Sequence, residues 1–404
     1  MAISAPIYLD YNATTPVDPA VVGAMLPYLR EHFGNPASDH AYGSIAHAAV
    51  DRARAQLAEL LGAAPGEIVF TGGGSEANNL ALWGVAGAYR ARGNHLITSA
   101  IEHPAVLQPL LALESRGYRL TILPVDRDGR VDPNQVAAAI TSETLLISIM
   151  HANNEVGTLQ DLRAIADIAH ARGILVHTDA AQSVGKIRVN VNELGVDLLS
   201  VAGHKLYAPK GVGALYIRKG VELEPFLRGA GHERGLRAGT ENVPSIVGLG
   251  IATRVAASHL ESAATRLRAL RDALHASLLA QVPDAQLNGH PVERLPNTLN
   301  LSFPGVNAAA LLARIRDRVA CSTGSACHAG QAEPSGVLLA MGRDAGLAAA
   351  ALRLSLGLGT GADEVQQAAS VIGAAVALER TRTANRIGPL RAAPAGARIP
   401  APIT

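Results

Sequence analysis

The sequence predicts an α/β protein with a large domain built on a mostly parallel sheet and a second, smaller α+β domain. Six strand-like runs are separated by helical or loop stretches: 67–71, 95–99, 119–124, 144–150, 174–178 and 197–201. Strands that alternate with helical patterns favour βαβ units, in which helices cover both faces of a parallel sheet. Right-handed crossovers then place the carboxyl ends of the strands at one edge, where ligands bind in open α/β sheets. A further run at 213–218 is predicted to pair antiparallel.

The segment before this alternation contains a short strand, two helices and a loop. Residues 7–15 predict a strand that leads into a turn, and residues 18–30 predict a helix. Residues 33–38 predict a loop, because Asn-Pro disfavours helix at the asparagine. Apolar residues at helical spacing predict a second helix over 44–61, which ends at Gly62 as its cap.

The character of the sequence changes near residue 257. A long Ala/Leu/Arg-rich helix precedes Pro283, and shorter strand-like pieces follow at 297–303 and 351–356. The end of the chain is rich in Ala, Pro and Arg, which is typical of a flexible tail. We predict a large domain over 15–257, a small domain over 1–14 and 258–383, and a flexible tail over 384–404.

Composition excludes several classes of function. The chain has 404 residues, is 48% hydrophobic and carries a net charge of +1, so no basic surface for nucleic acid is expected. Charges or prolines interrupt the apolar stretches before the roughly 18 residues that a membrane span needs. The first residues lack a signal-peptide pattern, and two cysteines in so long a chain fit a reducing compartment. We therefore expect a cytoplasmic protein that does not bind membranes.

The stretch around which the chain is organised is Asp-Leu-Leu-Ser-Val-Ala-Gly-His-Lys, residues 197–205. A strand-like run breaks at Gly203, and His204 and Lys205 follow on the next turn. A lysine just beyond a buried strand is placed to act as an amine nucleophile toward a carbonyl group. The alternative is a surface lysine on a loop, because lysine is rarely buried.

A glycine-rich turn follows the strand at 67–71. Its sequence, Gly72-Gly73-Gly74-Ser75, runs into a helix, whose free N–H groups and positive dipole end suit a phosphate. The turn matches neither the dinucleotide fingerprint nor the P-loop, which favours a single phosphate group. An ordinary glycine turn is the alternative.

Polar residues also follow three other strands. His103 comes after 95–99 and can stack on a planar ring or move protons, although a structural histidine is equally compatible. Asn154 lies in a polar run after 144–150, which can equally be a simple turn. Asp179 and Gln182 follow 174–178, where a carboxylate can pair with a protonated pyridine nitrogen or cap a helix. The glycine-rich turn, His204, His103, Asp179 and Lys205 together predict a pyridoxal phosphate site at one sheet edge.

Both cysteines lie in one stretch rich in small residues, 319–335. Cys327 stands among small polar residues and precedes His328, which is the setting of a reactive thiol. Cys321 is predicted to pack inside. A metal site is not expected, because the spacing is not C-x-x-C and no second pair exists. The cofactor can draw electrons from Cα of an amino acid, so that the Cys327 thiolate takes the side-chain sulfur as a persulfide and alanine is released.

With these residues assembled, residues 7–380 closely resemble the cysteine desulfurases, which are pyridoxal phosphate-dependent enzymes of the class V aminotransferase group. The resemblance is strongest to the branch with a long catalytic loop, which serves nitrogenase and iron–sulfur cluster assembly. It rests on Tyr8-Leu9-Asp10-Tyr11-Asn12-Ala13-Thr14-Thr15-Pro16, Gly34-Asn35-Pro36-Ala37-Ser38, Asn153-Asn154-Glu155-Val156-Gly157, Gly203-His204-Lys205, Arg237-Ala238-Gly239-Thr240 and Ser325-Ala326-Cys327.

The resemblance implies an aminotransferase-like large domain (fold type I), a homodimer and a role for each matching residue. Lys205 would bind the cofactor aldehyde and take the Cα proton, His103 would stack on the ring and transfer protons, and Cys327 would carry the persulfide. Asn35 and Arg353 would bind the substrate carboxylate, since an Arg fork matches that group. The implied cofactor-binding residues are Gly74, Ser75, His103, Asn154, Asp179, Gln182, His204, Lys205 and, at the neighbouring subunit's phosphate, Thr240.

The chain departs from the family pattern at two places. Ala202 stands where many relatives have a serine hydroxyl on the phosphate, and the tail lacks the aromatic ending that some relatives use with a scaffold partner. Selenocysteine lyases share the same framework and are the alternative function. A partner-binding subunit without chemistry has no use for Lys205, and an ordinary aminotransferase has no use for the Cys327 stretch. A sulfur acceptor in cluster or thio-cofactor assembly is the expected partner.

Overall fold

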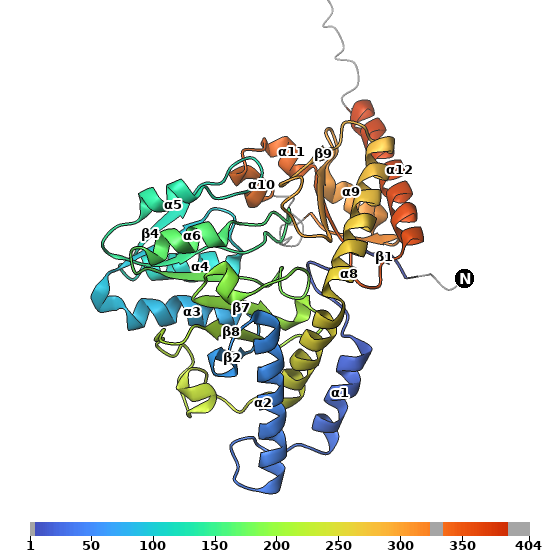
Figure 1. The fold of residues 1–404 in the computed structure, drawn as a ribbon. Helices are drawn as coiled ribbons and strands as arrows, with labels where there is room; N and C mark the ends of the chain where they lie inside the picture. Colours follow the sequence, from blue (N-terminus) through green and yellow to red (C-terminus); the bar gives the residue numbers. More distant parts are fainter. Residues whose placement is uncertain (1–4, 324–333, 387–404) are drawn as a thin grey trace, which may run out of the picture.

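The computed structural model describes residues 5–323 and 334–386. Its centre is a seven-stranded sheet of order β2-β8-β7-β6-β5-β3-β4, in which only β8 runs opposite to the others (Figure 1). The fold class predicted from the sequence is confirmed, including the antiparallel strand at 213–218. The strands are β2 Ile68–Thr71, β3 His95–Ser99, β4 Arg119–Leu123, β5 Thr144–Ser148, β6 Leu175–Asp179, β7 Leu198–Ala202 and β8 Gly213–Ile217.

Helices cover both faces of this sheet. Alternate residues of one strand serve opposite faces: Phe70 belongs to the hydrophobic cluster that includes residues of α2, α5, α6 and α8, whereas Val69 belongs to the cluster that includes residues of α3 and α4. Residues of β3, β5 and β7 are buried throughout, as expected for strands covered on both sides. The helices that accompany the sheet are α1 Pro19–Arg30, α2 Ala41–Leu61, α3 Gly74–Ala88, α4 Pro104–Glu114, α5 Pro133–Ala139, α6 Leu162–His170 and α7 Val191–Leu194.

Helix α2 begins three residues earlier than the sequence predicts. His40 caps it, because the ring Nδ1 accepts a hydrogen bond from the Gly43 amide at 3.2 Å. The predicted end is confirmed, since Gly62 adopts the left-handed conformation with a φ of 67°.

Helix α8, Val243–Gln281, connects two hydrophobic cores. Its first half, with Ile246 and Leu249, packs in the large-domain core, and its second half, with Leu274 and Leu278, packs in the small-domain core. The helix breaks at His259, whose φ of −140° is not helical. The break lies two residues beyond the boundary predicted at residue 257, and the domain division stays a prediction.

An 18-residue window of α8 is long and apolar enough to cross a membrane by length and composition alone, contrary to the sequence-based expectation. The window is 44% buried within the protein, and the helix packs against α1, α2 and α12. The apolar surface of α8 therefore serves as packing surface between the two cores.

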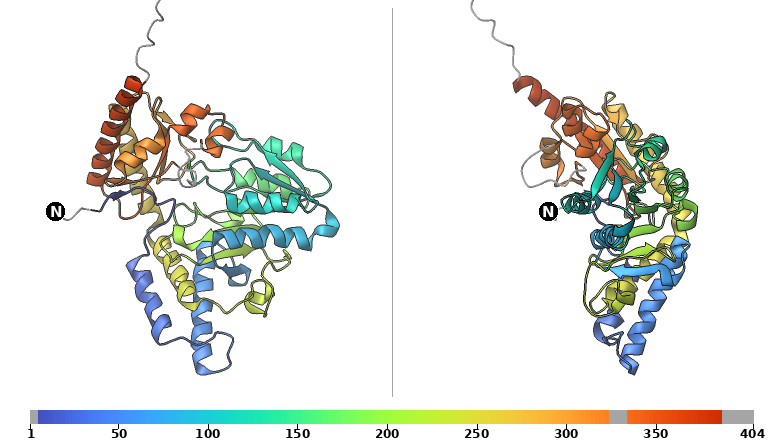
Figure 2. Two further views of the ribbon diagram at one scale, coloured as in Figure 1. Left: turned by 180° about the vertical axis from the view of Figure 1, so that it is seen from behind. Right: turned by 90° about the vertical axis from the view of Figure 1, so that its left-hand side faces the viewer.

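The small domain contains a three-stranded antiparallel sheet of order β12-β10-β9. The N-terminal strand β1 joins this domain by pairing parallel with β11, and Leu9 lies in its core. Figure 2 shows this lobe at one end of the molecule and the loop between α1 and α2 at the other. The elements are β1 Ile7–Tyr8, β9 Gln286–Leu287, β10 Thr298–Ser302, α9 Ala308–Ile315, β11 Val319–Ala320, α10 Gly336–Ala340, α11 Ala345–Ala349, β12 Ala351–Ser355 and α12 Ala362–Arg386.

Candidate active site

Lys205 lies directly after β7, in the short 3₁₀ helix Gly203–Lys205. Its Nζ donates hydrogen bonds to the carbonyl oxygens of Asn12 at 2.5 Å and Ala13 at 2.8 Å. The pKa of the Lys205 amine is lowered to about 8, mainly by burial and also by the charge of Arg353, while Asp179 acts in the opposite direction. An amine with this pKa is roughly one-tenth neutral at pH 7, which makes it a competent nucleophile and base.

Asp179 ends β6 and is buried. Its Oδ2 accepts a hydrogen bond from Asn78 Nδ2 at 2.8 Å, and its Oδ1 accepts from the Ala181 amide at 2.9 Å. No helix begins after Asp179, because residues 181–183 form a turn, so the helix-cap alternative raised from the sequence is wrong. One oxygen of Asp179 caps this turn, while the other faces α3. Gln182 is also buried, and its Nε2 donates to the Asn12 carbonyl at 3.0 Å. Both predicted ring-binding side chains thus lie where β6 leaves the sheet.

The glycine-rich turn forms the N-terminus of α3, which begins at Gly74. Gly73 has a φ of 151°, a backbone conformation that residues with a side chain rarely adopt. A Cβ added to Gly74 would lie 3.0 Å from the Cβ of Ala202 at the end of β7. The turn therefore packs against the strand that leads to Lys205, and Ser75 lies in the first turn of the helix. Such a helix N-terminus offers free N–H groups to an anion.

His204 lies beside this turn and hydrogen-bonds through Nδ1 to Thr14 Oγ1 at 3.1 Å. Burial lowers the pKa of His204 to about 4, and the neighbouring charges of Lys205 and Lys210 act in the same direction. With Nδ1 bonded to Thr14, the Nε2 of His204 can offer a hydrogen bond to a phosphate.

His103 caps α4, because its Nδ1 accepts a hydrogen bond from the Ala105 amide at 3.1 Å. In the neutral ring the proton therefore resides on Nε2. The side chain reaches solvent but is desolvated on its protein side, which lowers its pKa; the nearby Asp179 carboxylate opposes this shift and the Lys205 charge adds to it. His103 lies within electrostatic range of both groups, as the sequence predicts.

Arg353 lies in the middle of β12 and is buried. Its Nη2 donates to Asp10 Oδ1 at 2.7 Å, and its Nη1 donates to the Asn154 carbonyl at 3.2 Å. Its Nε is buried without a hydrogen-bond partner among the described residues. The small domain thus presents a guanidinium close enough to Lys205 to lower its pKa.

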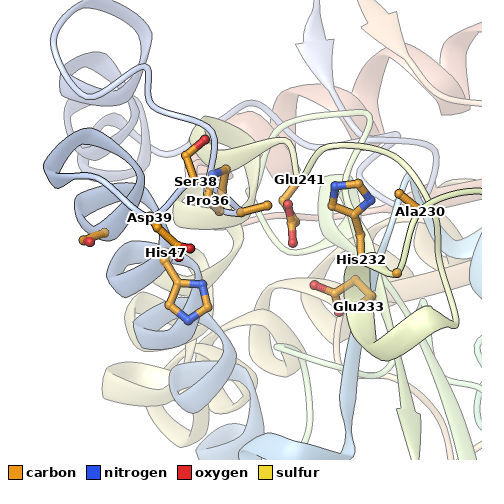
Figure 3. Close-up of a pocket in the computed structure, with 11 residues that line it drawn as sticks. Pro36, Ser38, Asp39, His47, Ala230, His232, Glu233 and Glu241 are labelled. Atoms are coloured by element: carbon orange, nitrogen blue, oxygen red, sulfur yellow. The ribbon is translucent and has the colours of Figure 1, made fainter.

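Asn35 and Thr240 are not brought to this site within one chain. Asn35 is exposed in the loop between α1 and α2, and Thr240 is exposed in the segment that precedes α8. These two segments line a separate pocket of about 600 Å³, which Figure 3 shows between Asp39, Glu241 and the other lining residues. The pairing of Asn35 with Arg353 stays a prediction that requires a second copy of the chain.

The ion pair between Arg54 and Glu233 fixes the second of these segments. Glu233 Oε1 accepts from Arg54 Nη2 at 2.7 Å, and its Oε2 accepts from the Phe70 amide at 2.8 Å. Glu233 and Arg234 have φ angles of 47° and 58°, a backbone conformation that non-glycine residues adopt only when held. The segment carrying Thr240 is therefore anchored to α2 and β2 of its own chain.

Cys327 and His328 lie outside the described residues. Cys321 is a free cysteine that packs against the small-domain core, as predicted. Burial raises the pKa of its thiol to about 12, so it is protonated at neutral pH. Among residues 5–323 and 334–386, no group of three or more His, Cys, Asp or Glu side chains is arranged to hold a metal ion.

Sequence reasoning gave no role to Glu102, which precedes His103. This buried carboxyl accepts hydrogen bonds on Oε1 from Ser99 Oγ at 2.6 Å and from the Met150 amide at 3.0 Å. Burial raises its pKa to about 8. Its Oε2 has no partner among the described residues. Its place between a strand-like run and His103 is the sequence signal that could have marked this acid.

The class V aminotransferase family model matches residues 7–368. A cysteine desulfurase IscS of Dictyoglomus turgidum is 46% identical over 91% of this chain and 93% of its own length. The mouse cysteine desulfurase is 46% identical over 91% of this chain and 81% of its own. Among solved structures, a NifS-like protein covers 92% of this chain and 100% of its own, with 37% identity and a TM-score of 0.87. SspA in complex with cysteine covers 86% and 98%, with 39% identity and a TM-score of 0.77.

Proposed function

The chain belongs to the class V aminotransferase family and, within it, to the cysteine desulfurases, and from this premise we propose that it uses pyridoxal 5′-phosphate to convert L-cysteine to L-alanine. The sulfur passes to Cys327 as a persulfide and from there to an acceptor protein. One observation carries the proposal: a desolvated lysine amine at the end of β7 lies within electrostatic range of Asp179, His103 and Arg353.

The donor set fits the cofactor. Gly74, Ser75 and His204 would hold its phosphate, which is supported by the free N–H groups of α3 and by the close packing of Gly74 on Ala202. Because Ala202 has no hydroxyl, these groups would bind the phosphate without a contact from that position. Asp179 would pair with the ring nitrogen, and Gln182 and Asn154 would hold the ring edge. When bound, the cofactor supplies an electron sink for Cα of an amino acid.

The remaining steps belong to side chains of the protein. Arg353 would bind the substrate carboxylate, Lys205 would take the Cα proton, and His103 would move protons through Nε2, since its Nδ1 is occupied by the Ala105 amide. The Cys327 thiolate then attacks the substrate sulfur. One C–S bond breaks, one S–S bond forms and the carbon takes a proton, so no external oxidant is needed.

A homodimer is part of this proposal. Asn35 and Thr240 are exposed on segments outside the site of their own chain. They could bind substrate or cofactor only at the site of a second copy. Exposed apolar side chains on and beside α1 and α2 support a covered surface there: Val22, Leu26, Leu29, Phe33, Tyr42 and Ile45. We expect a solution mass of two chains by light scattering, and a monomer-sized mass would contradict this part of the proposal.

The activity is tested with the full chain, reconstituted with pyridoxal 5′-phosphate and supplied with L-cysteine and a reductant. We expect alanine and sulfide in equal amounts. Absence of alanine would overturn the proposal, and turnover of L-selenocysteine without L-cysteine would assign the selenocysteine lyase activity instead.

The pKa of Lys205 gives a pH dependence for cofactor attachment. Only the neutral amine attacks the aldehyde, so the attachment rate to the cofactor-free protein should rise about tenfold per pH unit below the midpoint and level off above pH 8. The measurement is the rate at which the bound chromophore forms between pH 6 and 10. A midpoint near 10.5, the ordinary lysine value, would show that the amine is not desolvated as described.

A further inference from the structure

A second lysine, Lys186, lies beside this site and has no role in the chemistry described above. The chain has only four lysines, at 186, 205, 210 and 219. Lys186 follows β6 by way of Gly185, whose φ is 78° and whose added Cβ would lie 3.0 Å from Cβ of Leu206. This tight turn brings the chain close to Leu206, the neighbour of Lys205, and the Lys186 amine is buried.

The Lys186 amine contacts two amide side chains. Its Nζ donates to Gln182 Oε1 at 2.7 Å and to Asn12 Oδ1 at 3.3 Å. Desolvation lowers the pKa of Lys186 well below its usual range, and the charges of Lys205 and Arg353 act in the same direction. A buried amine with two acceptors is costly to leave unpaired, so both contacts should persist.

These contacts fix which way each amide faces. Because the Gln182 oxygen accepts from Lys186, its nitrogen faces the other way, where it donates to the Asn12 carbonyl at 3.0 Å. The same carbonyl accepts from Lys205 Nζ at 2.5 Å. Lys186 therefore contacts the ring-binding amide directly, and it reaches the carbonyl that receives the reactive amine through Gln182 and through the side chain of Asn12.

Asn12 extends this network into the small domain. It is buried, and its side-chain Nδ2 donates to Thr298 Oγ1 at 2.9 Å and to the Asn154 carbonyl at 3.2 Å. Its backbone amide donates to Ser355 Oγ at 2.9 Å, two residues beyond Arg353 on β12. Every hydrogen-bonding group of Asn12 is used, so its orientation is fixed by partners from both domains.

We propose that Lys186 is a positioning residue for cofactor attachment, which acts by holding the Gln182 and Asn12 amides so that the Asn12 carbonyl receives the Lys205 amine. This inference rests on the proposed pyridoxal phosphate site. Lys186 would affect binding of the aldehyde and the ring of the cofactor, because it contacts Gln182 and Asn12 and none of the residues expected to hold the phosphate.

The test measures cofactor binding and attachment and does not depend on turnover. Full-length parent, Lys186→Met, Lys186→Arg and Lys219→Met proteins are stripped of cofactor and titrated with pyridoxal 5′-phosphate. The attached cofactor is then trapped with borohydride and mapped by mass spectrometry, which is simple with four lysines. Methionine keeps the length of the chain without a donor, arginine keeps the donors, and Lys219 is an exposed matched control.

We expect Lys186→Met to bind the cofactor about tenfold more weakly and to attach it more slowly at Lys205, because hydrogen bonds to two buried amides are lost. Lys186→Arg should restore the affinity to within about threefold of the parent, and Lys219→Met should match the parent. The circular dichroism spectrum of each cofactor-free variant shows whether it is folded.

Two results would overturn the inference. A folded Lys186→Met protein with parental affinity and attachment rate removes the positioning role outright. If Lys186→Met does not fold, a folded Lys186→Arg protein that binds as the parent supports the role, whereas one that binds tenfold more weakly contradicts it. If the parent itself attaches no cofactor at Lys205, the proposed function has failed, and that outcome is distinguishable from either result above.

Discussion

Replacing Lys205 by alanine should lower alanine formation from L-cysteine by at least about a thousandfold. Removal of a positioned general base alone costs about 10²- to 10⁴-fold, and this residue would also hold the cofactor. Its amine donates hydrogen bonds to two backbone carbonyls, those of Asn12 and Ala13. The measurement is alanine formed per minute by the variant at saturating cofactor.

The matched control is Lys219→Ala, an exposed lysine after β8, which should keep the parental rate. Partial rescue of Lys205→Ala by a small primary amine in solution would show that the lost group is an amine acting as a base. A Lys205→Ala protein with more than about a tenth of the parental rate would contradict the role given to this residue.

The sheet and its functional edge were predictable from the sequence. Apolar runs of four to eight residues separated by helical patterns predict a parallel sheet, and parallel strands end on the same edge. His103, Asp179 and Lys205 each follow such a run within four residues, so their placement at one edge is a consequence of topology. In the structure the charges of Asp179 and Lys205 both act on the pKa of His103, and the charge of Asp179 acts on that of Lys205, so the three groups lie within electrostatic range of one another.

Contacts between distant segments were not predictable. Asn12 lies in the family motif at residues 8–16, but its place in the hydrogen-bond network depends on partners such as Thr298, which is 286 residues away. Lys186 has no local pattern that marks it, since its desolvation comes from packing of both domains. The pair Arg353 and Asp10 is separated by 343 residues, and it exists only because β1 joins the small domain.

The Asp10 carboxylate bears on how Arg353 could serve a substrate. In this structure Asp10 already occupies one arm of the guanidinium, while Nε is buried and has no hydrogen-bond partner in the part of the chain that the structure describes. An orphan buried donor is costly, so an incoming carboxylate that satisfies Nε would gain stabilisation that Asp10 does not supply. The arrangement favours a substrate carboxylate bound through the unpaired side of the fork.

The two cysteines allow a second test with a large expected effect. Replacing Cys327 by alanine should lower sulfide release from L-cysteine by at least about a hundredfold, because removal of an enzyme nucleophile leaves only background turnover. The measurement is sulfide released under reducing conditions. The expected loss follows from chemistry: without a thiolate no S–S bond can form, so the substrate sulfur has no acceptor.

Cys321→Ala is the matched control, and it should keep the parental rate within about twofold. Its thiol packs against the small-domain core, and a pKa of about 12 leaves it protonated at pH 7.5, so it cannot supply the thiolate. Alkylation by iodoacetamide separates the two residues, because only a thiolate reacts: in the folded protein Cys327 should be modified and Cys321 spared. If Cys321→Ala abolishes sulfide release while Cys327→Ala does not, the persulfide must form on the buried thiol, and the assignment of Cys327 as the sulfur carrier is wrong.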